Sequence, residues 1–130
     1  GNPKGVPPIG PDLLRHWRQI QMTPGPLNLF SDLPWPAVGE VFEDLLRRGS
    51  VRIERIVSSS RPEPVLYDQP HDEWVLLLQG EARLWRAGEE LDLRSGDSLL
   101  IPAGTPHRVL LTSADPPCVW LAVHIGPDPS

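Results

Sequence analysis

The pattern of apolar and polar residues becomes typical of β-strands after residue 50. Residues 51–58 alternate between apolar and polar side chains, and residues 74–78 form a continuous apolar run that is typical of a strand buried on both faces. Similar short segments follow at 82–85, 91–93, 98–101, 107–112 and 119–125, separated by glycine- and proline-containing turns. Many short strands at regular spacing predict an all-β fold, a single antiparallel jelly-roll barrel of about eight strands.

Two segments ahead of these strands have helical spacing instead. In residues 13–22, leucine, tryptophan and isoleucine side chains share one helical face, and Asp12 is placed to cap the first turn. In residues 40–48, four apolar side chains share a face, acidic residues come first, arginines come last and Gly49 follows as a C-cap. We therefore expect one or two short helices near the N-terminus.

The composition fits one small domain. The chain has 130 residues, 39% of them hydrophobic, and a formal net charge of −5. An acidic surface without basic clusters argues against nucleic acids and anionic membranes as partners. Prolines cluster near both ends of the chain. We therefore predict a proline-rich arm over residues 1–26, which is partly disordered or forms a short helix, then a β domain over 27–126 and a tail over 127–130.

Cysteine usage and hydropathy bear on the compartment. Cys118 is the only cysteine, so no intrachain disulfide can form, which is compatible with a reducing compartment. No apolar stretch approaches the length of a membrane span, and no signal-peptide pattern opens the chain. We expect a cytoplasmic location.

Two short motifs carry the candidate chemistry. In the first, Glu73 heads an apolar run that closes with Gly80; in the second, Gly96 begins an apolar strand that leads through a Pro-x-Gly turn to His107. Side chains of the same parity in a strand share a face. If the backbone stays extended, one face therefore presents Tyr67, Gln69, His71 and Glu73.

These spacings resemble the two signature motifs of the cupin superfamily, G-x5-H-x-H-x3–4-E-x6-G and G-x5-P-x-G-x2-H-x3-N. E-x6-G and G-x5-P-x-G-x2-H fit without a gap, whereas Tyr67 and Gln69 stand at the two histidine positions and Leu111 replaces the asparagine. The chain is similar to short cupins that have Tyr-x-Gln-x-x-Asp-Glu-Trp-Val at this place. The resemblance, over about residues 51–125, implies a double-stranded β-helix that usually holds one divalent metal ion between the motifs.

The resemblance implies that Glu73 and His107 are metal ligands, and this donor pair suits Zn²⁺, Mn²⁺, Fe²⁺ or Ni²⁺. Two ligands are not enough, and three residues compete for the third place. His71 would complete a set of two histidines and one carboxylate. Gln69 would offer its amide oxygen, as in cupin-type phosphomannose isomerases. Tyr67 would bind as a phenolate, as in some cupin lyases that cleave sulfonium substrates.

Two functions follow from the resemblance. The first is a metal-dependent enzyme for a small polar substrate, of isomerase, lyase or dioxygenase type, with Tyr67 or His71 in acid–base roles. The alternative is a metal-free, non-catalytic cupin that binds a small ligand. His124 is a weak site candidate, because the sequence does not tell which face of its strand points inward. We also expect a homodimer that buries the N-terminal arm or a tryptophan-rich outer face.

Overall fold

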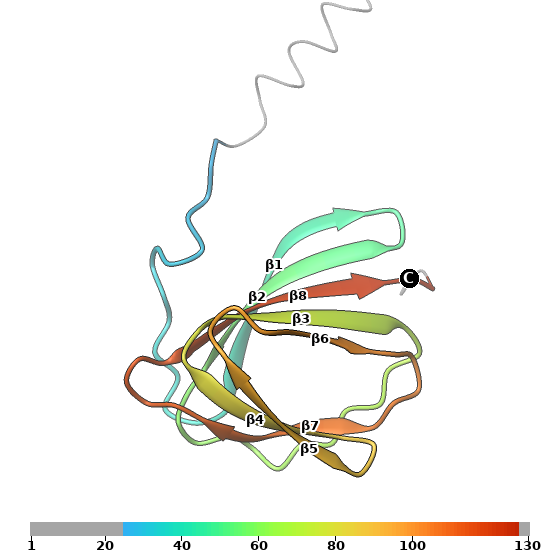
Figure 1. Ribbon diagram of the computed structural model, residues 1–130. Coiled ribbons are helices and arrows are strands. Elements are labelled where there is room, and N and C mark those ends of the chain that lie inside the picture. The colour runs from blue at the N-terminus through green and yellow to red at the C-terminus, as the bar shows by residue number, and fades with distance from the viewer. Residues whose placement is uncertain (1–24, 128–130) are drawn as a thin grey trace, which may run out of the picture. The chain divides into compact units, whose positions relative to one another are not determined.

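The computed structural model describes residues 25–127 and contains eight β-strands (Figure 1). They are β1 (Glu40–Arg48), β2 (Val51–Ser58), β3 (Asp72–Gln79), β4 (Glu81–Arg86), β5 (Glu89–Arg94), β6 (Ser98–Ile101), β7 (His107–Thr112) and β8 (Cys118–Ile125). The chain divides into two compact units, Gly1–Ser31 and Asp32–Ser130, and every strand belongs to the second. Between residues 25 and 127, no helix is long and apolar enough to cross a membrane.

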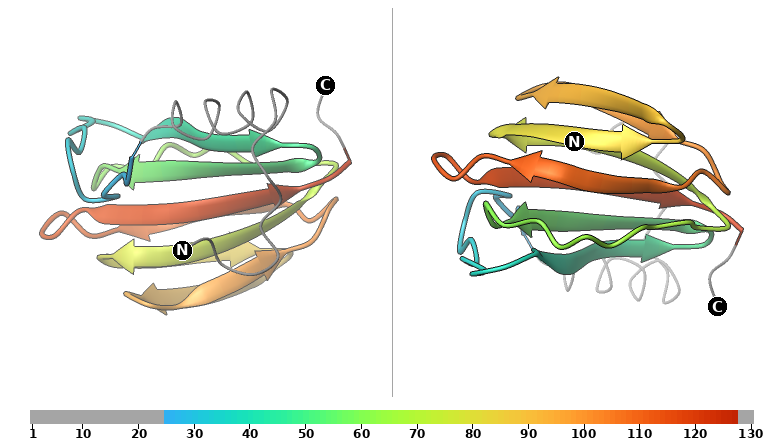
Figure 2. Two further views of the ribbon diagram at one scale, coloured as in Figure 1. Left: turned by 90° about the horizontal axis from the view of Figure 1, so that it is seen from above. Right: turned by 90° about the horizontal axis from the view of Figure 1, so that it is seen from below.

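The strands form two antiparallel sheets, and this all-β architecture confirms the jelly-roll prediction. The larger sheet has the order β1-β2-β8-β3-β6, and the smaller has the order β5-β4-β7. Figure 2 shows that β1 and β2 extend beyond the edge of the three-stranded sheet. Part of the inner face of β1 and β2 is therefore not covered by a second sheet.

An apolar core fills the space between the two sheets. Leu77 and Ala122 are fully buried in the larger sheet, and Leu84 and Leu93 face them from the smaller one. Trp120 joins this cluster, and its indole N–H donates a hydrogen bond of 3.0 Å to Ser58 Oγ. Burial of alternate side chains along β3 and β4 matches the alternation in the sequence.

The helix predicted over residues 40–48 is wrong, because this segment is the edge strand β1. It pairs with β2 from Glu40 opposite Ser58 to Arg48 opposite Val51, and Gly49, with φ of 59°, lies in the hairpin turn instead of capping a helix. A bulge between Asp44 and Leu46 breaks the strand alternation. Leu45 and Leu46 therefore follow each other as they would on one face of a helix. The helix predicted over residues 13–22 lies outside the described residues.

Candidate functional site

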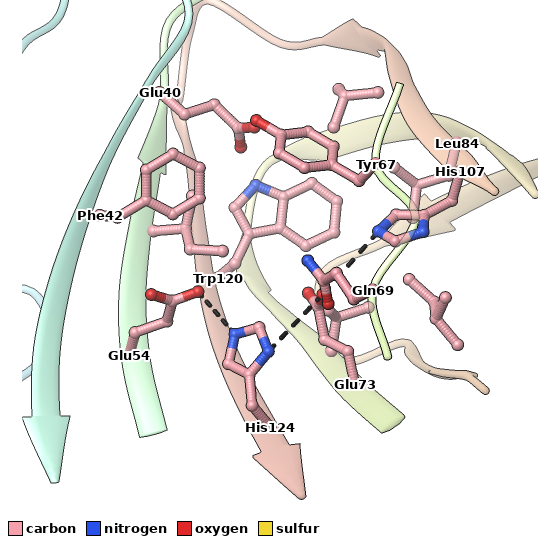
Figure 3. Close-up of a pocket in the computed structure, with 14 residues that line it drawn as sticks. Glu40, Phe42, Glu54, Tyr67, Gln69, Glu73, Leu84, His107, Trp120 and His124 are labelled. Carbon is pink, nitrogen blue, oxygen red and sulfur yellow. Dashed lines mark hydrogen bonds and ion pairs between the residues drawn. The ribbon is translucent and has the colours of Figure 1, made fainter. Parts of the chain in front are cut away.

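A cavity of about 60 Å³ lies between the sheets (Figure 3). A buried water needs roughly 10–15 Å³ on this measure, so the cavity has room for a few water molecules or a small ligand group. Aromatic and aliphatic side chains make up much of its wall. The polar side chains that line it are Glu40, Glu54, Tyr67, Gln69, Glu73, His107 and His124.

Glu73 and His107 face each other across this cavity, with side chains that are each 9% exposed. His107 Nδ1 lies 2.9 Å from the carbonyl oxygen of Thr105 and donates its proton there. In the neutral ring, Nε2 then presents its lone pair, and it lies 3.8 Å from Glu73 Oε1. That distance is too long for a hydrogen bond, but two ligands of one ion at about 2.0–2.2 Å lie roughly 3–4 Å apart. A backbone carbonyl that fixes the second ring nitrogen is typical of metal-binding histidines.

Backbone hydrogen bonds to the second motif place Tyr67 and Gln69 beside this pair. Tyr67 and His107 bond to each other through both backbone groups, at 2.8 and 2.9 Å, and their rings stack at 5.7 Å. The carbonyl of Gln69 accepts a hydrogen bond of 2.7 Å from the N–H of Gly104. Gln69 Oε1 is buried and has no hydrogen-bond partner among the described residues. The structure therefore brings Tyr67, Gln69, Glu73 and His107 to one cavity, as the sequence predicted.

His71 does not line this cavity. Its Nε2 lies 2.8 Å from His124 Nδ1, and His124 Nε2 lies 2.7 Å from Glu54 Oε1. The imidazole of His124 therefore donates to the carboxylate of Glu54 and accepts from His71. Arg52 bonds the second oxygen of Glu54 at 2.9 Å. Glu54, His124 and His71 form a hydrogen-bonded chain that runs from the cavity wall toward the surface.

Sequence reasoning missed Glu40 and Glu54 and gave His124 too little weight. The position of His124 follows from strand pairing, because β8 places it opposite Glu73 on β3 and residues opposite each other share a face. Its side chain comes within 3.9 Å of Glu73 Oε1. One signal in the sequence of β2 could have placed Glu54 on the inner face. Glu54 has the same parity as Ile56, which packs in the core.

The cavity has a negative electrostatic character. Burial raises the pKa of Glu73; His124 and His107 oppose this shift, and the carboxylate of Glu54 adds to it. Burial also raises the pKa of Glu40 against a hydrogen bond from Ser58, and three other carboxylates add to the effect. The pKa of Tyr67 is raised by burial and then by nearby glutamates, Glu40 first. Tyr67 is therefore a protonated phenol at neutral pH.

These residues fit a divalent metal ion only if a side-chain amide takes part. Among the described residues, no group of three or more His, Cys, Asp or Glu side chains is arranged to hold a metal ion. The buried, unsatisfied oxygen of Gln69, whose side chain also hydrogen-bonds Glu73, would supply a third donor beside Glu73 and His107. One nitrogen and two oxygen donors suit Zn²⁺, Mn²⁺, Fe²⁺ or Ni²⁺. Among the three candidates for third ligand, this geometry favours Gln69.

The sequence pattern of the cupin domain matches residues 60–124. This chain belongs to the cupin family. The cupin is 42% identical to a putative mannose-6-phosphate isomerase from Ralstonia eutropha JMP134, with a TM-score of 0.73 over 80% of this chain and 100% of that chain. A search among curated proteins gave no match.

Two further solved structures show the same fold at lower identity. A cupin superfamily protein from Desulfitobacterium hafniense DCB-2 is 21% identical, with a TM-score of 0.67 over 79% of this cupin and 92% of that chain. The structure of FeII HppE is 18% identical, with a TM-score of 0.59 over 67% of this cupin and 50% of that chain. At these identities, the likeness concerns the fold alone.

Proposed function

We propose that this cupin binds one divalent metal ion through Glu73, His107 and Gln69 and acts as an enzyme on a small polar substrate, by isomerase, lyase or dioxygenase chemistry. The observation that carries the proposal is the contact of His107 Nδ1 with the carbonyl oxygen of Thr105, which leaves Nε2 free to accept. The Nε2 lone pair points at the Glu73 carboxylate across a gap too wide for a hydrogen bond. A cation between these atoms would balance the charge of a buried carboxylate, which is otherwise costly to keep ionised.

Each side chain has a role suited to its surroundings. A bound divalent ion would polarise a carbonyl or hydroxyl oxygen of the substrate as a Lewis acid. Tyr67 keeps its proton at neutral pH, so its hydroxyl is suited to donate a proton or a hydrogen bond to the substrate. Glu40, whose pKa is raised mainly by burial, is a second proton-transfer candidate, and Figure 3 shows the Tyr67 hydroxyl directed toward it. His71 would act only through His124, because it lies behind that ring.

The relative from Ralstonia eutropha bears on the substrate. Its description as a mannose-6-phosphate isomerase supports the isomerase type of reaction. A sugar phosphate, however, needs a cationic side chain or a set of backbone N–H groups for its phosphate. Neither Lys nor Arg occurs among the described residues that line the cavity. Isomerase chemistry is therefore one of the reaction types proposed for this cupin, but a phosphorylated substrate is not proposed.

One observation favours the alternative, a metal-free cupin that binds a small ligand. Tyr67 and Gln69 occupy the places where a metal-binding cupin would be expected to carry histidines, and no cluster of three strong ligands exists among residues 25–127. In that case a proton on Glu73 would stabilise the buried carboxyl in place of a metal ion.

Elemental analysis separates the two functions. We expect the protein purified without added metal to carry close to one equivalent of a first-row transition metal per chain. Glu73→Gln should lose most of it, because an amide is a weaker ligand than a carboxylate. Glu90→Gln is the matched control, since Glu90 is an exposed residue of β5 in the other sheet. Metal below about one tenth of an equivalent in the wild-type protein, even after growth in metal-supplemented medium, would favour the metal-free alternative.

A further inference from the structure

A second cavity, of about 70 Å³, adjoins the first, and we call it the outer cavity. The two share the side chains of Glu40, Phe42, Tyr67 and Val109 in their walls, and the outer one adds Glu63. It lies at the overhanging edge of the larger sheet, where β1 extends beyond the smaller one (Figure 2). Phe42, which lines both cavities, is 49% exposed, so this part of the wall borders solvent.

Two carboxylates stand in the outer cavity without a cationic side chain among its described lining residues. Glu63 lies over Gly39, since a Cβ built on that glycine would come within 2.7 Å of Glu63 Oε1. Glu40 Oε2 accepts a hydrogen bond of 2.8 Å from Ser58 Oγ. Glu54, deeper in the first cavity, differs because Arg52 pairs with its charge and His124 donates a hydrogen bond to it. The uncompensated negative charge therefore gathers at Glu40 and Glu63.

Aromatic side chains surround the carboxylate of Glu40. Figure 3 shows Phe42, Tyr67 and Trp120 around it, and of these Phe42 and Tyr67 also line the outer cavity. Ser58 Oγ accepts a hydrogen bond from the indole N–H of Trp120 and donates one to Glu40. This chain fixes the orientation of the ring and the carboxylate before any ligand arrives. Pre-organisation of this kind lowers the entropic cost of binding.

We propose that the outer cavity recognises an organic cation, namely an ammonium or methylated ammonium group of the substrate. Aromatic faces attract such a group through their quadrupole, and a nearby carboxylate supplies the counter-charge. An anionic group would meet repulsion from Glu40 and Glu63 without a compensating cation. The inference deepens the proposed function, since it names the substrate class of the same site, but it stands on different residues from the metal ligands.

The test compares two probes of the same shape. Choline and 3,3-dimethyl-1-butanol differ mainly in the charge at the quaternary centre. Isothermal titration calorimetry on the full chain, with and without EDTA, should show choline binding at least about tenfold more tightly than the neutral alcohol. Glu40→Gln should remove most of this preference while keeping the hydrogen bond to Ser58. Phe42→Leu should weaken choline binding about threefold or more, and Glu90→Gln should leave it unchanged.

The outcomes separate this inference from the metal proposal. Equal affinity for the two probes, unchanged choline binding in Glu40→Gln, or no choline binding in the wild-type protein would each overturn the organic-cation site. Tighter binding of mannose 6-phosphate than of choline would overturn it as well. Metal content measured on the same samples tests the other proposal. Choline binding by wild-type protein that carries no metal as purified would support the cation site and contradict the metal enzyme. Bound metal without choline binding would support the metal site and contradict the cation site.

Discussion

His107 Nε2 lies 3.8 Å from Glu73 Oε1, and each of these two side chains is 9% exposed. The two residues lie on different sheets, because Glu73 belongs to β3 of the larger sheet and His107 to β7 of the smaller one. Each sheet thus supplies one ligand of the candidate metal centre. Binding an ion here would link the sheets and should therefore be measurable as stability.

The first prediction concerns metal-dependent stabilisation. Wild-type protein should gain on the order of 2–3 kcal/mol in free energy of unfolding at a metal concentration about a hundredfold above the Kd. Glu73→Gln and His107→Ala should lose most of this gain, because each removes a ligand from one sheet. Differential scanning fluorimetry with and without Zn²⁺, Mn²⁺, Fe²⁺ or Ni²⁺ measures the effect. If the wild-type protein and both variants shift equally on metal addition, the ion binds elsewhere.

The second prediction concerns the chain of Glu54, His124 and His71. His124→Ala should destabilise the fold by about 2–3 kcal/mol, since it removes a hydrogen bond to a buried carboxylate. His71→Ala should lower the free energy of unfolding by about 1 kcal/mol or less. His71 hydrogen-bonds only Nδ1 of His124, which carries no charge, and it is partly exposed. Urea denaturation measures both values. His124→Gln, which can still donate to Glu54, should recover part of the loss; no difference between Ala and Gln would mean that the hydrogen bond contributes little.

The third prediction concerns pH. The pKa of Glu40 is raised above 4.5 in the folded state, chiefly by burial, so the native state binds this proton more tightly than the unfolded state does. The resulting stabilisation is present below pH 4.5 and is lost as the pH rises through the folded pKa. Glu40→Gln cannot ionise. Its melting temperature should therefore fall less with rising pH and should exceed that of the wild-type protein at about pH 8.

Melting curves from about pH 4.5 to 8 check this expectation. The carboxylates of Glu54, Glu63 and Glu73 act on Glu40, so they keep some pH dependence in the variant. Glu90→Gln removes an exposed carboxylate outside the cavity and should follow the wild-type curve. A Glu40→Gln protein less stable than wild type across the whole range would show that the ionised carboxylate stabilises the fold.

The fourth prediction compares two motif glycines with nearly the same backbone conformation. Gly80 has φ of 96° and Gly96 has φ of 94°, so alanine is strained at either position, by about 1–2 kcal/mol. A Cβ at Gly80 would also meet Cys118 Sγ and Ser113 Oγ at 2.8 Å, whereas Gly96 faces open space. Gly80→Ala should therefore cost about 1–3 kcal/mol more than Gly96→Ala. Equal losses in urea denaturation would mean that the neighbours of Gly80 shift easily.

The sequence determined the features that depend on local patterning. Alternation predicted β2, and short apolar segments between glycine and proline turns predicted β6 and β7, with the bounds that the structure gives them. Motif spacing and parity also placed Tyr67, Gln69, Glu73 and His107 at one cavity. Parity failed for His71, because the chain bends at residues 70 and 71 and the alternation does not carry through a bend.

Only the tertiary structure decided which segments pair as strands and lie side by side. Residues 40–48 became an edge strand because pairing with β2 outweighed a local helical pattern. His124 faces the cavity because β8 lies between β2 and β3, which sets it opposite Glu73 and next to Glu54. The contacts of His124 join residues about fifty or more positions apart, and such non-local pairings leave no periodic signal in the chain.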